Sequence, residues 1–475
     1  MIIAALTLLV LLLFTIIFSQ FLIVLIPLQV ALLSLLAIYN SKIFILTYIP
    51  FLLTYKFFIP FLNIDEYYEL LPVVINYVSF FLIFLTKKDF TLSRNSIFKK
   101  VIISISYILA ILLFGSFING APLFEILRWF LWITSPLLLA FYVYFSDIDH
   151  TELFKIIIDI LSLILIIQLP LVILQSIPGS ILNWGPNADF YSGTFGRGGT
   201  GFLSFLSSIV FYSYFIKAIN GHSKTSFLFI CFLVLFFSIY CDISFTIYIC
   251  MLSPLFFLLL RNYFKIQISQ KKIIQILLLS FIVTTAFIVP RITSFTSLLE
   301  NQDVTSFSLN RFNFSDLNEY SNMIWFAEDG GLRFGRSLGI SYSLYRVATS
   351  DFHQMIFGYG AGSTRAEDSA TGLSDSTVFR PVPQTNFFGI DLVSLEFGLI
   401  GLLVFFNLFY TLSFKFLAES HSFSEQLIIY LALLFLYFVY GLLYDGGWFF
   451  NSTKNGIFWV LSACCFYKID SQKIK

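Results

Sequence analysis

Arginine is concentrated in one polar stretch of the sequence, residues 291–386. The arginines of this stretch are Arg291, Arg311, Arg333, Arg336, Arg346, Arg365 and Arg380. A guanidinium group presents a planar fork of N–H donors that binds a phosphate or a carboxylate through two parallel hydrogen bonds. The pattern predicts an anion-binding surface. The alternative is that these arginines form ion pairs with the acids of the same stretch.

The same stretch also contains groups that could accept a proton. His353 is its one histidine, and its candidate carboxylates are Glu328, Asp329, Asp351, Glu367, Asp368 and Asp375. A histidine or a carboxylate can accept the proton of an attacking hydroxyl group. The sequence does not choose among them, because each acid also fits a solvated loop side chain and His353 also fits a helix at an interface.

Two glycine-rich segments accompany the arginines. Gly193–Gly201 contains Arg197 and precedes an apolar run, and Gly358–Ser363 follows a predicted helix over 336–356. Glycine lets a backbone adopt positive φ and approach a ligand, and a helix N-terminus favours an anion. The first segment lacks the Lys-Ser/Thr ending of a nucleotide-binding loop, so a tight re-entrant turn is the alternative reading.

The predicted helix over 336–356 has an apolar face suited to a membrane surface. The residues of this face are Ile340, Leu344, Val347 and either Phe352 or Met355, which recur at near-helical spacing. Arg336 and Arg346 are ten residues apart, just under three helical turns, so they are expected to share roughly one face.

The remaining sequence must position these groups within a membrane. Of 475 residues, 58% are hydrophobic and 12% are charged, and the mean hydropathy is +0.88. Soluble proteins carry about 25% charged residues. Continuous apolar runs predict helices rather than barrel strands. The predicted fold is an all-α polytopic membrane protein with twelve to fourteen transmembrane helices. The predicted spans are 2–18, 21–39, 43–62, 69–86, 101–118, 122–145, 154–177, 200–219, 226–240, 243–260, 273–290, 387–414, 425–444 and 456–468.

The distribution of lysine predicts the orientation. Lysine dominates one set of short loops, while arginine dominates the opposite side. Because basic residues in short loops favour the cytoplasm, both termini are expected there and the stretch 291–386 outside. The predicted parts are a bundle over 1–290 with a short external loop at 178–199, the external loop domain 291–386, and C-terminal helices over 387–475. No residue spacing indicates a metal site, and no metal or other cofactor is expected.

Three blocks of this sequence resemble the superfamily of O-antigen polymerases and O-antigen ligases, membrane glycosyltransferases that act on lipid-linked glycans. The first is Gly193–Arg197, similar to the family's Gly-Thr-Phe-Gly turn. The second is Arg336–Gly362, an arginine-led helix that runs into the Phe-Gly-Tyr-Gly turn. The third joins Gln384–Phe388 to Leu395–Gly401. The resemblance implies a fold of the GT-C type.

One departure from the family separates its two branches. Ligases carry a histidine just before the asparagine that corresponds to Asn386, whereas this chain has Gln384 and Thr385 there. The resemblance therefore favours a polymerase, which transfers a growing undecaprenyl-diphosphate-linked glycan onto the next lipid-linked repeat unit at the outer face of the bacterial inner membrane. A ligase is the nearest alternative, and a non-enzymatic flippase or transporter is the second.

The resemblance also implies roles and partners. Arg336, Arg346 and His353 are the expected catalytic residues, and Glu396 is expected to support the site. Expected to bind the diphosphate or the glycan are Arg197, Arg333, Arg365, Arg380, Gln384 and Asn386. The implied partners are undecaprenyl-diphosphate-linked oligosaccharides, membrane lipid, a chain-length regulator and a flippase, and no nucleic acid.

Overall fold

The computed structural model describes the chain as almost entirely helical. The described residues are 2–61, 68, 70–86, 96–177, 180, 191–195, 200–222, 224–241, 324–326, 332–334, 336–361, 389–416, 425–441 and 452–474. Seven of the helices among them are long and apolar enough to cross a membrane, and shorter apolar helices accompany these. The chain is therefore an all-α, multi-pass membrane protein.

The helices lie close to the predicted spans. Each span predicted before residue 241, and each predicted after residue 386, falls on a helix. The bounds differ most near the C-terminus, where the span predicted at 425–444 meets an α-helix that ends at Phe435 and a π-helical turn that ends at Tyr440, and the span predicted at 456–468 meets a longer helix, Ser452–Ile474. The spans predicted at 243–260 and 273–290 lie outside the described residues.

The chain forms two compact units, each assembled from segments that are distant in the sequence. The first unit comprises Met1–Leu71, Asp147–Leu309 and His421–Leu436, and the second comprises Pro72–Ser146, Asn310–Ser420 and Tyr437–Lys475.

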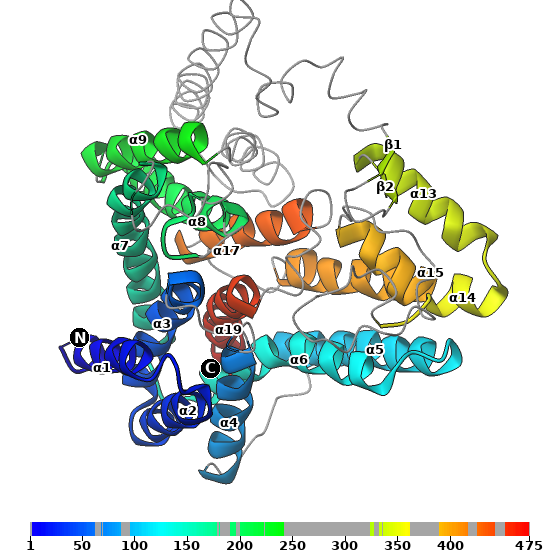
Figure 1. Ribbon diagram of the computed structural model, residues 1–475, viewed down its shortest axis with the longest axis horizontal. Coiled ribbons are helices and arrows are strands. Elements are labelled where there is room, and N and C mark those ends of the chain that lie inside the picture. The colour runs from blue at the N-terminus through cyan, green and yellow to red at the C-terminus, as the bar shows by residue number, and fades with distance from the viewer. Residues whose placement is uncertain are drawn as a thin grey trace, which may run out of the picture. The chain divides into compact units, whose positions relative to one another are not determined.

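Helices α3 and α8 organise the first unit. Its elements are α1 (Ile2–Ile17), α2 (Leu22–Tyr39), α3 (Ser41–Phe61), α7 (His150–Ser176), the 3₁₀ turn η3 (Gly193–Phe195), α8 (Thr200–Ile219), α9 (Lys224–Tyr240) and α17 (Glu425–Phe435). Helix α3 packs against α1, α2 and α7, while α8 packs against α7, α9 and α17 (Figure 1).

Buried polar side chains tie these apolar helices together. The amide of Gln29 on α2 donates to the Thr15 hydroxyl on α1 at 2.7 Å, and the Tyr68 hydroxyl donates to the Gln29 carbonyl oxygen at 2.6 Å. Lipid offers no competing hydrogen bonds, so such pairs fix which helix faces are neighbours.

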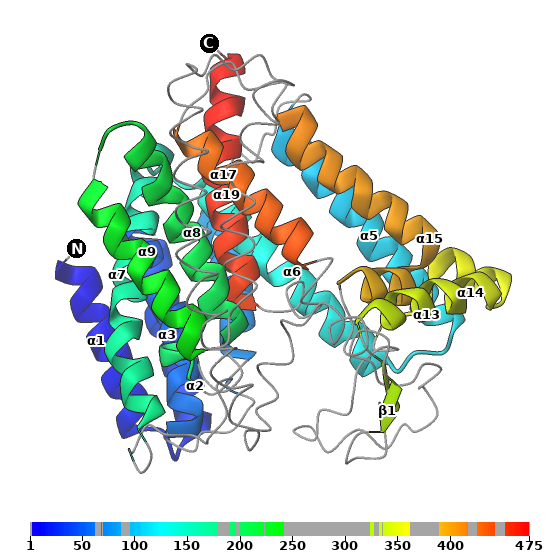
Figure 2. The same ribbon diagram turned by 90° about the horizontal axis from the view of Figure 1, so that it is seen from above.

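The second unit contains the helices of the candidate site. Its elements are α4 (Leu71–Thr86), α5 (Ile97–Ile118), α6 (Leu123–Phe145), the strands β1 (Ile324–Phe326) and β2 (Leu332–Phe334), α13 (Arg336–Thr349), α14 (Phe352–Phe357), α15 (Gly389–Tyr410), the π-helical turns η7 (Thr411–Lys415) and η8 (Leu436–Tyr440), and α19 (Ser452–Ile474). Helix α19 packs along α6, and α15 runs beside α5 (Figure 2). Helices α13 and α14 pack on α15 near its first residues.

The helical stretch predicted over 336–356 is present but is divided into two helices. The chain breaks after Thr349, and α14 begins at Phe352. The hydroxyls of Thr349 and Ser350 bond back to the carbonyls of the last turn of α13, which offers the backbone an alternative to continuing the helix.

The apolar residues predicted to form one face of that stretch are consequently divided between two environments. Val347 and Met355 pack inward against Tyr359, whereas Leu344 and Phe352 are exposed. The break at residues 350–351 gives α13 and α14 separate buried faces.

Asp470 joins three helices at one end of the second unit. Its buried carboxylate, on α19, accepts hydrogen bonds from the Ser96 hydroxyl at 2.6 Å and the Ile97 N–H at 3.1 Å, at the start of α5. It also accepts one from the Tyr144 hydroxyl on α6 at 2.8 Å. The acid therefore satisfies one of the first N–H groups of α5, which have no partner within their own helix.

Replacing Asp470 by alanine is expected to destabilise the protein by about 3 kcal/mol or more, because three donors lose their acceptor in a buried place. Asp470→Asn keeps one acceptor oxygen and should cost less. The check is the thermal melting of the purified protein in detergent. Ser471→Ala is the matched control, since the Ser471 hydroxyl donates only to the Lys468 carbonyl of the same helix. Equal melting of Asp470→Ala and Ser471→Ala would contradict the role assigned to Asp470.

Candidate functional site

Helix α15 is interrupted within its membrane-spanning segment. At Gly398 the backbone leaves helical geometry, with φ +66° and ψ −166°. An interruption of this kind takes carbonyl groups of the preceding turn out of the helical hydrogen-bond ladder, and such groups are costly unless they find partners inside the protein. Here the Tyr359 N–H donates to the Leu395 carbonyl at 2.7 Å, and the Gly360 N–H donates to the Glu396 carbonyl at 3.2 Å.

These contacts join the second and third sequence blocks into one structure. We call it the glycine junction, made of Phe357–Ala361, Leu395–Gly398 and the end of α5 at Gly115–Asn119. A Cβ atom added to Gly358 would lie 2.4 Å from the Glu396 carbonyl oxygen. One added to Gly398 would lie 2.4 Å from the Gly358 nitrogen. Glycine is required where two backbones come this close.

The end of α5 closes the junction from the other side. The Asn119 side-chain amide donates to the Gly358 carbonyl at 2.9 Å, and the Gln354 amide donates to the Asn119 side-chain oxygen at 3.2 Å. The Ser116 hydroxyl accepts from the Ala361 N–H at 2.8 Å. The sequence had pointed to none of these three side chains. The one available signal was a polar pair, Ser116 and Asn119, at the end of a long apolar run.

The glycine-rich segment Gly358–Ser363 was predicted to let the backbone approach a ligand. In the described part of this turn, the glycines let the backbone approach α15 and α5. A Cβ atom on Gly360 would lie 2.6 Å from the Ser116 Cα atom, which leaves no space for a ligand at that point.

Of the arginines predicted to act at the site, Arg346 is the one whose side chain the structure describes. It lies in the last turn of α13, partly buried, with its guanidinium carbon 5.8 Å from the centre of the Tyr359 ring. Tyr359 is almost fully buried and packs with Val347 and Leu395. A cation over an aromatic face is attracted by the ring, so this contact helps to hold the guanidinium in place. Tyr359 was not among the predicted site residues.

The other predicted catalytic residues lie on the same or adjoining elements. Arg336 is the first residue of α13, about 15 Å from Arg346 along the helix axis and roughly 80° away around it. The two arginines therefore share a helix and lie nearly three turns apart on it. His353 is partly exposed on α14, and Asp351 is exposed just before that helix.

Two further predicted residues are placed by the backbone or by burial. Arg333 lies on β2, opposite Trp325 of β1 in an antiparallel pair. The Glu396 side chain is fully buried on α15, directly before the interruption of that helix. The remaining predicted residues lie outside the described part of the chain; they are Arg197, Arg365, Arg380, Gln384 and Asn386, together with the acids Glu328, Asp329, Glu367, Asp368 and Asp375.

The first glycine-rich segment belongs to the first unit, and its turn is buried there. The Gly193 N–H donates to the Gln175 side chain at 2.8 Å, and the Thr194 N–H donates to the Gln168 side chain at 2.7 Å. The two amide groups return hydrogen bonds to the Gly193 carbonyl and the Thr194 hydroxyl. These two backbone N–H groups are therefore not available to an anion, and the re-entrant turn is the reading that the structure supports. Two glutamines seven residues apart in an apolar run were the signal for this contact.

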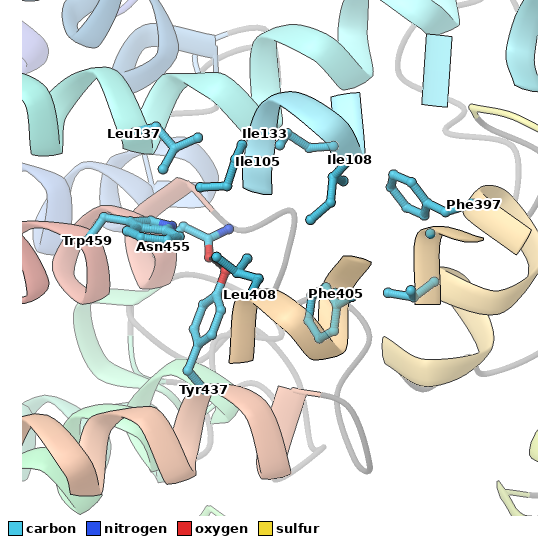
Figure 3. A pocket seen from close by; sticks show the side chains of 12 residues that line it. Ile105, Ile108, Ile133, Leu137, Phe397, Phe405, Leu408, Tyr437, Asn455 and Trp459 are labelled. Atoms are coloured by element: carbon cyan, nitrogen blue, oxygen red, sulfur yellow. Dashed lines mark hydrogen bonds between the residues drawn. The ribbon is translucent and has the colours of Figure 1, made fainter. Parts of the chain in front are cut away.

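A cavity of about 70 Å³ lies within the second unit, between α5, α6, α15 and α19 (Figure 3). Its lining is apolar apart from Tyr437 and Asn455, whose side chains share a hydrogen bond of 2.7 Å. Phe397 lines the cavity at one end and forms part of the glycine junction. The cavity offers space for a few methylene groups and contains none of the predicted chemical groups.

Within the described ranges, no group of three or more histidine, cysteine, aspartate or glutamate side chains is arranged to hold a metal ion. The chemistry available near the glycine junction is that of the Arg346 guanidinium over the Tyr359 ring, with His353 on α14 and Asp351 directly before that helix. No protein-family model, no curated protein and no solved structure matches this chain.

Proposed function

We propose that this protein is a polysaccharide repeat-unit polymerase. It transfers a glycan from undecaprenyl diphosphate onto the next lipid-linked repeat unit, at the outer face of a bacterial inner membrane, and the product is an O-antigen, a capsule or a similar polymer. Both termini lie in the cytoplasm in this proposal, and the stretch 291–386 forms the external loop domain of a fold of the GT-C type.

The observation that carries the proposal is the glycine junction. The second and third of the blocks that resemble the polymerase and ligase superfamily are separate in the sequence, yet Tyr359 and Gly360 bond directly to Leu395 and Glu396, more than thirty residues further along the chain. A shared site gives the two blocks a reason to be held together, with Arg346 at their meeting point.

The proposed mechanism needs charge stabilisation more than covalent chemistry. The leaving group is a lipid diphosphate, which gains negative charge as the glycosidic bond breaks. A guanidinium already oriented by Tyr359 can stabilise this charge without reorganising. Arg346 takes this role at one diphosphate, and Arg336 binds a separate phosphate group further along α13. His353 or Asp351 is the proposed acceptor of the proton from the attacking hydroxyl group.

The interruption in α15 argues against a transporter, because the chain itself satisfies the carbonyl groups that the interruption frees. Transporters that carry ions use broken helices whose freed carbonyls coordinate the ion. Here the carbonyls of Leu395 and Glu396 accept hydrogen bonds from the chain's own Tyr359 and Gly360. The interruption therefore serves to attach the glycine-rich turn.

The test is deletion of the gene in its own host, followed by the surface glycan profile and extraction of lipid-linked intermediates. The expected result is loss of the polymer ladder, with single repeat units still reaching their acceptor. Complementation with the unchanged gene should restore the ladder, and complementation with Arg346→Ala should not.

Two other outcomes would replace the proposal. Long polymer that accumulates on undecaprenyl diphosphate would identify a ligase. An unchanged profile would remove the glycan function altogether and make the transporter the leading candidate.

A further inference from the structure

Helices α13 and α14 both expose large apolar side chains. Leu344 is 47% exposed, Tyr345 67% and Phe352 76%. We call these three residues the α13–α14 apolar surface. Large apolar groups left in water are unfavourable, and several of them on adjoining helices indicate a contact surface.

The contact between α14 and α5 indicates where this surface lies relative to the end of the membrane-spanning segment. A Cβ atom on Gly115 would lie 2.5 Å from the Phe357 carbonyl oxygen, so the end of α14 is in direct contact with α5 at that point. Gly115 comes three residues before Ile118, where the membrane span ends, which is about 5 Å along the helix axis. The end of α14 at Phe357 therefore lies alongside the last turn of the span, and Gln354, earlier in α14, donates to the Asn119 side chain directly after the span.

The neighbouring side chains of α5 are exposed and apolar. Phe114, Phe117 and Ile118 belong to a membrane-spanning helix, so their exposed area faces hydrocarbon. The Phe357 ring contacts the Phe114 ring edge to face, with 4.7 Å between the ring centres. The outer side of α14 is thus continuous with a lipid-facing part of α5.

We propose that the α13–α14 apolar surface binds the lipid bilayer. Leu344, Tyr345 and Phe352 enter the boundary between headgroups and acyl chains, where amphipathic helices bury their apolar faces by about 5–10 Å and where tyrosine is favoured. This inference goes beyond the proposed function and does not depend on it. Its consequence for the site is that Arg346, next to Tyr345 on α13, lies at the level of lipid phosphate groups.

The test places a nitroxide spin label at Phe352→Cys, in full-length protein whose native cysteines are replaced by alanine. The protein is reconstituted into vesicles of phosphatidylethanolamine and phosphatidylglycerol, and collisions of the label with oxygen and with a water-soluble nickel chelate are measured. Leu163→Cys, exposed in the middle of α7, is the lipid control, and His222→Cys, exposed in the turn after α8, is the water control.

The label at residue 352 is expected to meet oxygen several times more often than the chelate, as at residue 163. A ratio equal to that at residue 222 would show that the surface faces water and would overturn the proposal. Protection from both reagents would show that polypeptide covers the surface and would overturn it as well. Leu344→Cys supplies a second label position should Phe352→Cys elute as aggregated protein.

Discussion

Arg346→Lys is expected to lower the rate of glycan transfer about 100-fold, the effect of losing one oriented donor to a charged transition state. Lysine keeps the positive charge but has neither the planar fork that binds two phosphate oxygens nor a flat face to lie on the Tyr359 ring. The measurement is the initial rate of polymer formation by the purified full-length protein supplied with lipid-linked repeat units. The melting temperature should stay near that of the unchanged protein.

Tyr359→Phe is the matched control for this prediction. It keeps the aromatic ring beneath Arg346 and the packing against Val347 and Leu395, so the transfer rate should stay close to normal. Arg336→Lys is measured separately, because the two arginines are about 15 Å apart and act independently. If Arg346→Lys keeps the full rate while Arg336→Lys loses it, the diphosphate site belongs to the first turn of α13.

The helical fold was predictable from the sequence because the membrane imposes a strict rule. A chain that crosses hydrocarbon must satisfy its backbone groups internally, so long apolar runs must be helices. Helix α5, for example, begins and ends within one turn of the predicted span 101–118. Long apolar runs can be recognised from the local sequence alone, because their length and hydrophobicity do not depend on contacts with distant residues.

The glycine junction was not predictable, since it depends on contacts between distant residues. The sequence showed Gly358 and Gly398 as separate local features, and nothing in either segment indicates that the two backbones meet. The role of Asn119 was hidden for the same reason, because an asparagine after an apolar run is equally typical of an ordinary helix end. Arg346 was predictable by residue type, and its aromatic partner became evident only in the structure.

The break between α13 and α14 shows a limit of periodic patterns. Apolar residues recurred at near-helical spacing through residue 355, and this favoured one helix. Competing hydrogen bonds from Thr349 and Ser350 have no periodicity, so they leave no trace in such a pattern. A pair of adjacent hydroxyl residues followed by Asp351 was the only local sign of a turn.

Gly358→Ala is expected to destabilise the protein by about 3 kcal/mol or more and to abolish transfer. The residue has φ +76° and ψ −178°, a conformation that costs an L-residue about 1–3 kcal/mol. The added Cβ atom would also lie 2.4 Å from backbone atoms of Glu396, which cannot move without separating the turn from α15. The measurements are the melting temperature in detergent and the rate of polymer formation.

Gly120→Ala is the control that separates the backbone strain of a positive φ from the steric clash expected for Gly358→Ala. Gly120 also has positive φ, at +69°, but no atom lies within 4 Å of an added Cβ atom, so only the strain of about 1 kcal/mol remains. The difference in melting temperature between the two variants therefore measures the contact of the turn with α15. A Gly358→Ala protein that melts normally but is inactive would contradict this account. It would mean that the backbone at residue 358 approaches a substrate, and that the glycine is required for ligand binding rather than for packing against α15.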